Sequence, residues 1–468
     1  MEIRNPRTGK FDFSIQPVDA NGVRSRTISL RASQPGWMAK GIEQRVRVLQ
    51  QWHTLIEDYS TDLLESLIDD TGRKTESEKE LNYVLRAIDS WCEIAKKILR
   101  EPESLSTSIP VLKLQNHYEP FPLVGVISGW CFPFAHLMKE IIPALLAGSA
   151  VIAKPSCVTP RFVRTLNHTI HRTRGLREVL SLVEGTDDIL EPLCSNADFV
   201  CYNGTAAEAR QVSDIAHKLF KPSSIQHGLK NTVIVTETAD LENASSAILL
   251  GGFWNAGQSS SSIERVYVHR NVYHLFLSRL VGKANLIRLA YPTTESGQIG
   301  PIIAEPQINI INGQLWEALE NGAKLLTGIG QCEKWEGGYY CRPTIITNVK
   351  PSMKILNEET LAPILPVMSY QDTEEICEWV NGITQAHSGA IFSKTANEAI
   401  ALGDKLSIPY LSINDIALEE VLQVGQHPQM TPETLEFEGT FSNYKKFFRK
   451  KTFIINTHKP FGTGWIKS

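Results

Sequence analysis

Hydrophobic residues in the first hundred positions recur at the spacing of amphipathic helices. Positions three and four apart lie on one face of a helix, so such sets mark the side that packs against a core. The two clearest sets are Leu49, Trp52, Leu55 and Ile56, and Leu63, Leu64, Leu67 and Ile68. Residues 41–100 are therefore predicted to be helical.

After residue 120, short hydrophobic runs alternate with helical stretches. The first series has LVGVIS (123–128), SAVIAK (149–154), a strand near 179–184 and DFVCY (198–202), with helices at 160–172 and 205–217. A second series begins near residue 231 with NTVIV, RVYVH, AKLLT, ILPVMSY, GAIFS and YLSIN. Alternating strands and helices are typical of parallel sheets. The pattern predicts two α/β domains.

Two strand-like runs, 109–120 and 447–456, fit neither series. We expect them to form an arm that pairs between subunits, because an isolated strand would leave exposed edges. The first domain is expected to comprise 1–107 and 121–225 with part of 411–440. The second is expected to comprise 226–410.

The composition is that of an ordinary globular protein. The chain has 468 residues, of which 42% are hydrophobic and 21% charged, and a net charge of −4. A balance near neutrality does not favour nucleic acid or an anionic membrane as partner. The start lacks the apolar segment of a signal peptide, and no apolar run approaches the roughly 20 residues that span a bilayer. These features predict a cytoplasmic protein.

Eight cysteines are spread along the chain, and none forms a CxxC pair. No histidine accompanies them at zinc-binding spacing. The spacing therefore predicts that most of them are buried, reduced thiols, with neither a disulfide framework nor a structural metal.

Five segments in order resemble the aldehyde dehydrogenase superfamily. The segments are LVGVISGWCFP (123–133), AGSAVIAKP (147–155), YNGT (202–205), NAGQSSSSIERVYV (255–268) and EETLAPILPV (358–367). They are similar to the family's Pro-Trp-Asn-Phe-Pro turn, its Lys-Pro strand, its Phe-Thr-Gly-Ser turn, its Asn-x-Gly-Gln-x-Cys segment and its Glu-Glu-x-Phe-Gly-Pro segment. The resemblance implies a Rossmann-type cofactor domain, an α/β catalytic domain and a small β oligomerisation arm.

The resemblance also assigns cofactor contacts. Lys154 matches the lysine that reaches the adenosine ribose, Gly204 and Thr205 match the pyrophosphate turn, and Glu359 matches the carboxylate on the nicotinamide ribose. The other matching positions are Ile127, Ser128, Trp130, Ser156, Cys157 and Leu361.

Three of the matched positions depart from the family pattern. Cys157 stands where an acidic or small polar residue is usual, Ala209 replaces a glycine, and Leu361 replaces a phenylalanine. An acid at position 157 would repel a 2′-phosphate, and a cysteine does not, so NAD and NADP both stay open. Binding of either is expected to be weakened.

The three groups that carry aldehyde chemistry in this family are replaced. The nucleophilic Cys is Ser260, the general-base Glu is Gln226 and the oxyanion-donating Asn is Cys131. A serine needs an adjacent base, whereas a cysteine is partly ionised near neutral pH. A glutamine cannot accept the proton, and the adjacent His227 is expected to point away from it.

These replacements predict a catalytically degenerate family member that acts by binding or assembly. The alternatives are an active NAD(P)-dependent aldehyde oxidoreductase or a weak esterase that uses Ser260 or a relocated nucleophile at Cys131, and a structural protein with a closed pocket. The expected ligands are a small aldehyde or a nucleotide. The expected assembly is a homodimer or homotetramer, or a hetero-oligomer with an active paralogue.

Overall fold

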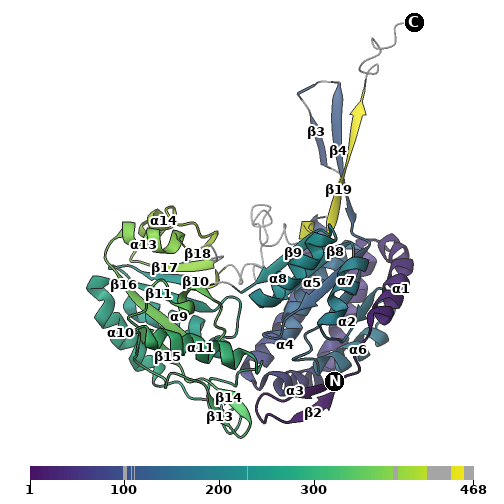
Figure 1. The fold of residues 1–468 in the computed structure, drawn as a ribbon. Coiled ribbons are helices and arrows are strands. Elements are labelled where there is room, and N and C mark those ends of the chain that lie inside the picture. Colours follow the sequence, from purple (N-terminus) through teal and green to yellow (C-terminus); the bar gives the residue numbers. More distant parts are fainter. Residues whose placement is uncertain are drawn as a thin grey trace.

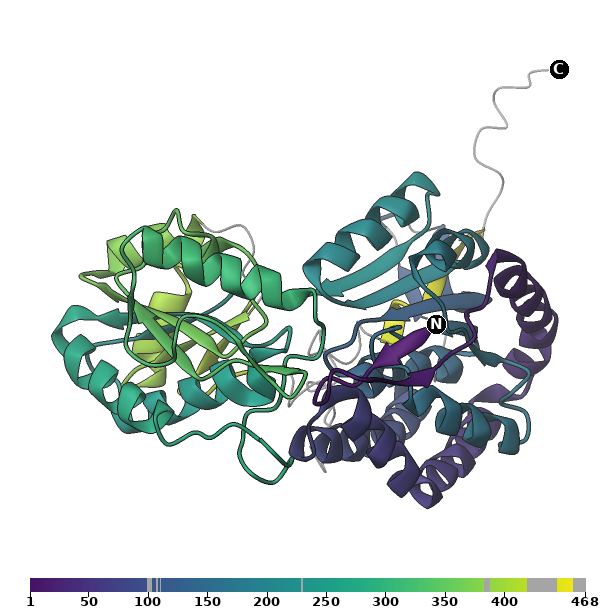
Figure 2. The same ribbon diagram turned by 60° about the horizontal axis from the view of Figure 1, so that its bottom comes forward.

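The computed structural model describes residues 1–98, 103–106, 108–109, 111–228, 230–382, 388–418 and 444–457. Two lobes stand side by side, and a narrow ribbon of strands projects from one of them (Figure 1). Each lobe is built on its own sheet. Figure 2 shows the lobes from below, with the N-terminal segment near their junction.

The first lobe contains a five-stranded parallel sheet. Its spatial order is β7 (Leu180–Leu182), β6 (Ala150–Lys154), β5 (Leu123–Ser128), β8 (Phe199–Gly204) and β9 (Ser223–His227). Every residue of β5, β6 and β8 is buried, as expected for parallel strands covered on both faces. The strand succession reverses between β5 and β8, which makes this the switch point of the sheet.

The helices predicted around this sheet are confirmed as α2 (Gly41–Asp58), α3 (Ser60–Thr71), α4 (Thr75–Ile98), α5 (Pro133–Ala147), α6 (Phe162–Arg172) and α8 (Ala206–Lys218). Two further helices, α1 (Ala20–Ala39) and α7 (Leu190–Asn196), were not predicted. Leu49, Trp52, Ile56, Leu63 and Leu67 are fully buried in the core of this lobe, so the helical periodicity located the right face.

The second lobe contains a seven-stranded sheet, parallel except for β12. Its spatial order is β12 (Lys324–Leu325), β15 (Thr344–Thr347), β16 (Ile364–Tyr370), β11 (Ile263–His269), β10 (Asn231–Val235), β17 (Ser388–Phe392) and β18 (Tyr410–Ile413). Its helices are α9 (Leu241–Phe253), α10 (Arg270–Ala284), α11 (Gln307–Glu320), α12 (Lys354–Asn357), α13 (Thr373–Asn381) and α14 (Ala396–Gly403).

Two expected domain boundaries differ from the structure. Residue 226 lies inside β9, so Gln226 belongs to the first sheet and not to the second. Of the segment 411–440, which was expected to join the first domain in part, residues 411–413 complete β18 in the second sheet, and 419–440 lie outside the described residues.

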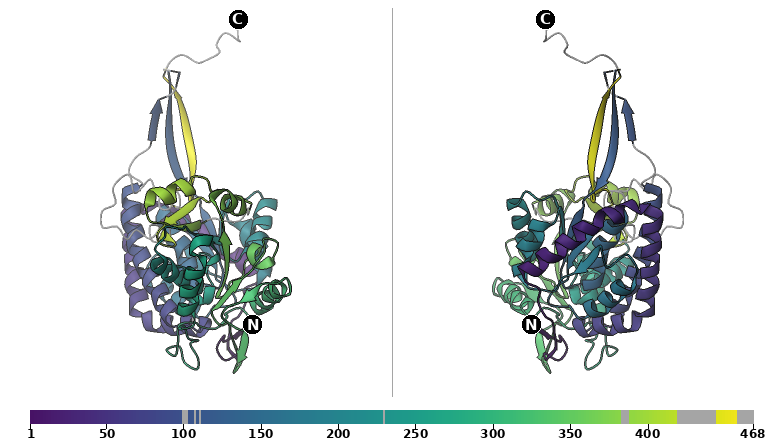
Figure 3. Two further views of the ribbon diagram at one scale, coloured as in Figure 1. Left: turned by 90° about the vertical axis from the view of Figure 1, so that its left-hand side faces the viewer. Right: turned by 90° about the vertical axis from the view of Figure 1, so that its right-hand side faces the viewer.

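The expected arm exists, but its two runs pair with each other within one chain. β19 (Phe448–Asn456) pairs antiparallel with β4 (Leu112–Pro120), and β3 (Glu103–Ser106) pairs with the other side of β4. Figure 3 shows the ribbon leaving the body of the first lobe. The edges open to another molecule are therefore those of β19 and β3, and not those of β4.

The prediction of reduced thiols, made for most of the cysteines, does not hold for one pair. Cys332 and Cys341 form a disulfide across the hairpin of β13 (Glu333–Trp335) and β14 (Gly338–Tyr340). Hairpin pairing sets the two residues opposite each other, which spacing along the chain could not reveal. This hairpin lies against the N-terminal segment β1 (Glu2–Arg4) and β2 (Phe11–Ser14), because Arg4 donates to the Gly337 carbonyl at 2.7 Å.

Neither a metal cluster nor a membrane span is found in the described part of the chain. No set of three or more His, Cys, Asp or Glu side chains in it is arranged to hold a metal ion. No helix within those residues is long and apolar enough to cross a bilayer.

Candidate active site

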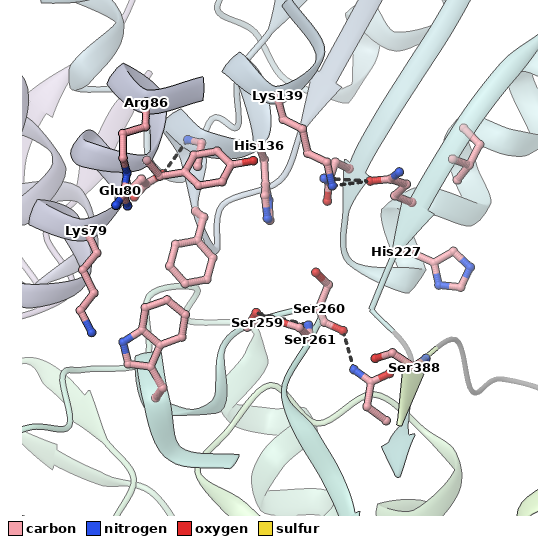
Figure 4. A pocket seen from close by; sticks show the side chains of 18 residues that line it. Lys79, Glu80, Arg86, His136, Lys139, His227, Ser259, Ser260, Ser261 and Ser388 are labelled. Carbon is pink, nitrogen blue, oxygen red and sulfur yellow. Dashed lines mark hydrogen bonds between the residues drawn. The ribbon is translucent and has the colours of Figure 1, made fainter. Parts of the chain in front are cut away.

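A cavity of about 700 Å³ lies between the two lobes. On the first-lobe side it is lined by residues of α4, α5, β8 and β9, and on the second-lobe side by the segment 254–261 and by Asn231 and Ser388. The labelled side chains in Figure 4 surround this space. Two of the three predicted catalytic positions, Ser260 and Gln226, line it.

Ser260 lies on a tight turn that follows the short helix η2 (Trp254–Gly257). Asn255 and Ala256 have positive φ of 57° and 53°, which non-glycine residues adopt only where the surroundings hold them. Gly257 has φ of 67°, and a Cβ there would meet the Ala362 carbonyl oxygen at 2.1 Å. Asn231 donates its amide to the Ser260 carbonyl at 2.9 Å, which fixes the turn against β10.

Gln226 lies on β9 on the first-lobe side of the cavity. Its side-chain oxygen accepts a hydrogen bond from the Lys139 ammonium at 3.2 Å and another from the Asn203 amide at 3.4 Å. The side-chain oxygen of Gln226 thus serves as a hydrogen-bond acceptor for the Lys139 ammonium. A carboxylate at this position would form an ion pair with Lys139, which favours its charged form and weakens it as a base.

His227 also lines the cavity, as the last residue of β9. The ring Nδ1 lies 2.9 Å from the Gly228 carbonyl oxygen, so Nδ1 carries the proton and Nε2 is left as the basic nitrogen.

Cys131 is not brought to the cavity wall. Among the described residues that line the cavity, its neighbour Phe132 is present and Cys131 is not. The Cys131 carbonyl accepts from Arg73 at 2.9 Å. Burial, and secondarily Glu359, raise the pKa of the Cys131 thiol well above its ordinary value, so the thiol stays protonated. The residue at the predicted oxyanion-donor position is therefore a buried, protonated thiol that does not line the cavity.

The expected cofactor residues meet at the carboxyl edge of the first sheet. Ser128, Lys154 and Gly204 end the parallel strands β5, β6 and β8 at this one edge. The Ser128 hydroxyl is buried and has no hydrogen-bond partner in the described part of the protein. A Cβ on Gly129 would lie 2.7 Å from the Gly204 Cα, so both glycines are needed for this close approach.

The start of α8 follows directly at the switch point. Thr205 caps this helix, because its hydroxyl accepts the Glu208 N–H at 3.4 Å. Unpaired N–H groups and the dipole at a helix start favour an anion. The unpartnered Ser128 hydroxyl, the close approach of Gly129 to Gly204 and the start of α8 together fit the pyrophosphate and ribose of a dinucleotide.

Glu359 reaches across from the second lobe to this helix start. Its Oε2 accepts the Ala206 N–H at 3.1 Å. A Cβ on Gly228 would meet Glu359 Oε1 at 1.7 Å, so the carboxylate lies directly against that backbone. Burial is the main cause that raises the pKa of Glu359 to about 7. The carboxylate thus holds the N–H that a pyrophosphate at α8 would use.

A buried ion pair fixes the segment that carries Glu359. Lys230 and Glu264 are paired at 2.9 Å and almost fully buried. Glu264 Oε1 accepts the N–H groups of Thr360 and Leu361 at 2.9 and 3.1 Å. Leu361 has φ of 50°, a strained conformation for a branched side chain. Its buried side chain packs with Trp130 and Cys131 and not against an open site.

The other predicted cofactor positions lie near the same edge with different degrees of access. The Ile127 side chain belongs to the core, so only its backbone can meet a ligand. The Ser156 hydroxyl accepts the Val158 N–H at 3.2 Å. Cys157 is partly exposed, and burial is the main cause that raises the pKa of its thiol.

A sequence profile described as "Aldehyde dehydrogenase family" matches residues 1–425. The chain belongs to the aldehyde dehydrogenase family. The solved structure of "Putative Aldehyde Dehydrogenase PutA" from Anabaena variabilis is 40% identical, covers 100% of both chains and superposes with a TM-score of 0.92.

Two more distant proteins are also similar to this aldehyde dehydrogenase family member. A "Putative succinate-semialdehyde dehydrogenase" of Mycolicibacterium smegmatis, whose name includes NADP(+), is 28% identical over 84% of this chain and 77% of its own. Betaine aldehyde dehydrogenase from Staphylococcus aureus, solved with NAD+, is 22% identical, covers 100% of this chain and 94% of its own, and has a TM-score of 0.88. The latter shows a shared fold.

Sequence reasoning missed the charged side chains around the cavity of this family member. Lys79 and Arg86 on α4 and Lys139 on α5 line it. Positions 79, 83 and 86 do lie on one helical face, and that spacing was the available signal. The spacing could not show that this face of α4 borders a cavity. The sequence does not say which residues of the second lobe lie opposite α4.

Proposed function

We propose that this aldehyde dehydrogenase family protein binds a dinucleotide and a small ligand without oxidising aldehydes. The observation that carries the proposal is the pair Gln226 and Lys139 in the cavity that contains Ser260. The site offers a neutral amide held by a cation where a base is needed, and a hydroxyl where a thiolate is needed. Neither group supplies the proton transfer or the attack.

The residues that would hold NAD or NADP are Ser128, Lys154, Gly204, Thr205 and Glu359. When bound, the nicotinamide would accept a hydride. The fit of the sheet edge and the NADP(+) and NAD+ of the relatives support this cofactor class. Binding is weakened, since the Glu359 carboxylate must first release the Ala206 N–H.

The protein is proposed to assemble through its arm, as a homodimer or homotetramer or with an active paralogue. Phe453, Ile454 and Ile455 on the edge strand β19 are 44%, 69% and 41% exposed. An apolar edge strand of this kind is a site for pairing with another chain. The proposed division into a cofactor lobe, a catalytic-type lobe and an arm is supported by the separation of the five-stranded, the seven-stranded and the three-stranded sheets.

A weak esterase activity at Ser260 is the second candidate. His227 lines the same cavity with Nε2 as its basic nitrogen, which supports this candidate. The alternative nucleophile, Cys131, is disfavoured by its burial and raised pKa. Hydrolysis of an activated ester that is lost in both Ser260→Ala and His227→Ala would support the esterase.

The test of the main proposal is an assay of purified protein with NAD and NADP against a panel of aldehydes, run beside an active dehydrogenase. Calorimetry with each nucleotide is performed on the same sample. We expect nucleotide binding and no formation of reduced cofactor. Sustained reduction of the cofactor would contradict the proposal, and absence of binding at millimolar nucleotide would contradict the cofactor assignment.

A further inference from the structure

Cationic side chains from two helices border the cavity. Lys79 and Arg86 lie on the same face of α4, separated by about two turns. Lys139 lies on α5, and its ammonium reaches Gln226 (Figure 4). An ammonium has three donors, so Lys139 can bind Gln226 and a ligand together.

The charge of these cations is not balanced within the cavity wall. Glu80 is the single carboxylate among the described residues that line it. Its Oε1 accepts the N–H groups of Phe134 and Ala135 at 2.8 and 2.9 Å at the start of α5. Burial raises the pKa of Glu80 to about 7, which reduces its charge near neutral pH. Burial and Lys139 lower the pKa of His136 to about 3, so His136 is neutral.

Unused hydrogen-bonding groups lie beside the cations. The Trp254 Nε1–H and the His136 Nδ1 are buried and lack a partner within the described residues. The Lys79 ammonium lies 5.4 Å from the centre of the Trp254 ring, so a cation of the first lobe and an N–H donor of the second lobe lie close together. Buried polar groups without partners are costly, and a bound ligand or water normally meets them.

We infer that this cavity binds a small organic acid, attracted by the cations Lys79, Arg86 and Lys139 that border it, with its other end at Ser260. A volume of about 700 Å³ is within the usual range for small-molecule sites. A cleft lined by one sign of charge concentrates ligands of the opposite sign. The inference deepens the proposed function, since it names the ligand class of the same cavity.

The experiment measures binding of linear dicarboxylates of increasing length by calorimetry at low ionic strength, with the matching uncharged diamides as controls. The double variant Lys79→Gln/Arg86→Gln removes two charges from exposed side chains, so folding is preserved. Lys324→Gln on β12 removes one exposed charge away from the cavity. We expect dicarboxylates to bind, about tenfold weaker binding in the double variant, and unchanged binding in the control.

Added salt should weaken dicarboxylate binding because partly exposed charges are screened. Equal binding of diamides, unchanged affinity in the folded double variant, or no dicarboxylate binding at all would each overturn the inference. No cofactor or aldehyde is present in this experiment. Aldehyde turnover in a separate assay would therefore contradict the non-catalytic proposal but not the inference of carboxylate binding. Failure of the one can thus be distinguished from failure of the other.

Discussion

The carboxyl edge of the first sheet and the cavity between the lobes differ in how they depart from the family pattern. At the sheet edge, Lys154 and Gly204 match the family residues at the ends of β6 and β8, and Thr205 keeps a hydroxyl at the start of α8 in place of the family's serine. In the cavity, Ser260 and Gln226 line the space, and we propose that they no longer act as nucleophile and base. Under this proposal the sheet edge keeps groups that bind a dinucleotide, whereas the cavity keeps only the positions of its reacting groups.

This difference separates binding from catalysis. A dinucleotide is held by strand ends, a helix start and close glycine contacts, which depend on the backbone. Aldehyde oxidation depends on two side chains with suitable pKa values. The fold can therefore preserve the first function after the second is lost, and variants in each region should affect one function and spare the other.

The largest expected effect is a gain of steady turnover in the variant Ser260→Cys/Gln226→Glu. A positioned general base contributes about 10²–10⁴-fold, so the double variant should exceed Ser260→Cys alone by that factor in steady-state reduction of NAD or NADP. Ser260→Cys/Gln226→Leu is the matched control and should stay at the level of the single variant. Equal rates for these two double variants would contradict the assigned role of position 226.

Lys139 should limit that gain. The carboxylate that Gln226→Glu introduces would be paired with the Lys139 ammonium and would have a lowered pKa. Adding Lys139→Gln to the double variant should raise turnover by roughly tenfold, the equivalent of one pKa unit. The pH–rate profile is the check: its acidic limb should move to higher pH when Lys139 is removed.

The buried pair Lys230 and Glu264 supports both regions, because it fixes residues 360 and 361 beside Glu359. Glu264→Ala leaves Lys230 charged and unpaired, at a cost of about 3–5 kcal/mol in the free energy of unfolding. Urea denaturation measures this. Glu242→Ala, which breaks an exposed pair with Lys283, is the control and should change little. A similar small loss for Glu264→Ala would show that the pair is not structurally important.

Glu359→Gln should strengthen binding of ADP about twofold to fivefold, since it removes a negative charge from the start of α8. ADP lacks the nicotinamide ribose, so this probe isolates the pyrophosphate contact. Because the pKa of Glu359 is raised to about 7, lowering the pH through that value protonates it and should strengthen ADP binding in the unaltered protein. The variant should lack this extra pH dependence in calorimetry, and equal pH dependence would argue against the contact.

The arm variant should have the smallest effect on both regions. Ile454→Lys places a charge on the exposed edge of β19, which should block pairing with another chain. Sedimentation at micromolar concentration should show an oligomer for the unaltered protein and a smaller species for the variant, with unchanged nucleotide affinity. A monomeric unaltered protein would contradict assembly through the arm.

The order of strands and helices was predictable because hydrophobic periodicity is local. The runs at 123–128, 149–154 and 364–370 became β5, β6 and β16. Pairings between distant segments were not predictable in the same way. The partner of 447–456 and the disulfide of Cys332 with Cys341 depend on which segments meet in space.

Prediction of the site from the sequence was limited in the same way, here by contacts between side chains. Motif spacing located Ser260 and Gln226, and both line the cavity. It gave no indication of Lys139 beside Gln226, of Glu359 on the Ala206 N–H, or of the burial of Cys131. Each of these is a contact between different elements, and such contacts determine pKa and access.

The most direct test of the proposed loss of aldehyde oxidation is rapid mixing of NAD-saturated protein with an aldehyde, measuring reduced cofactor per site within the first turnover. The unaltered protein should give no burst. Ser260→Cys should give at most one equivalent and then stop, because Gln226 cannot activate the water that releases the acyl group. A full burst followed by steady turnover in the unaltered protein would contradict the account.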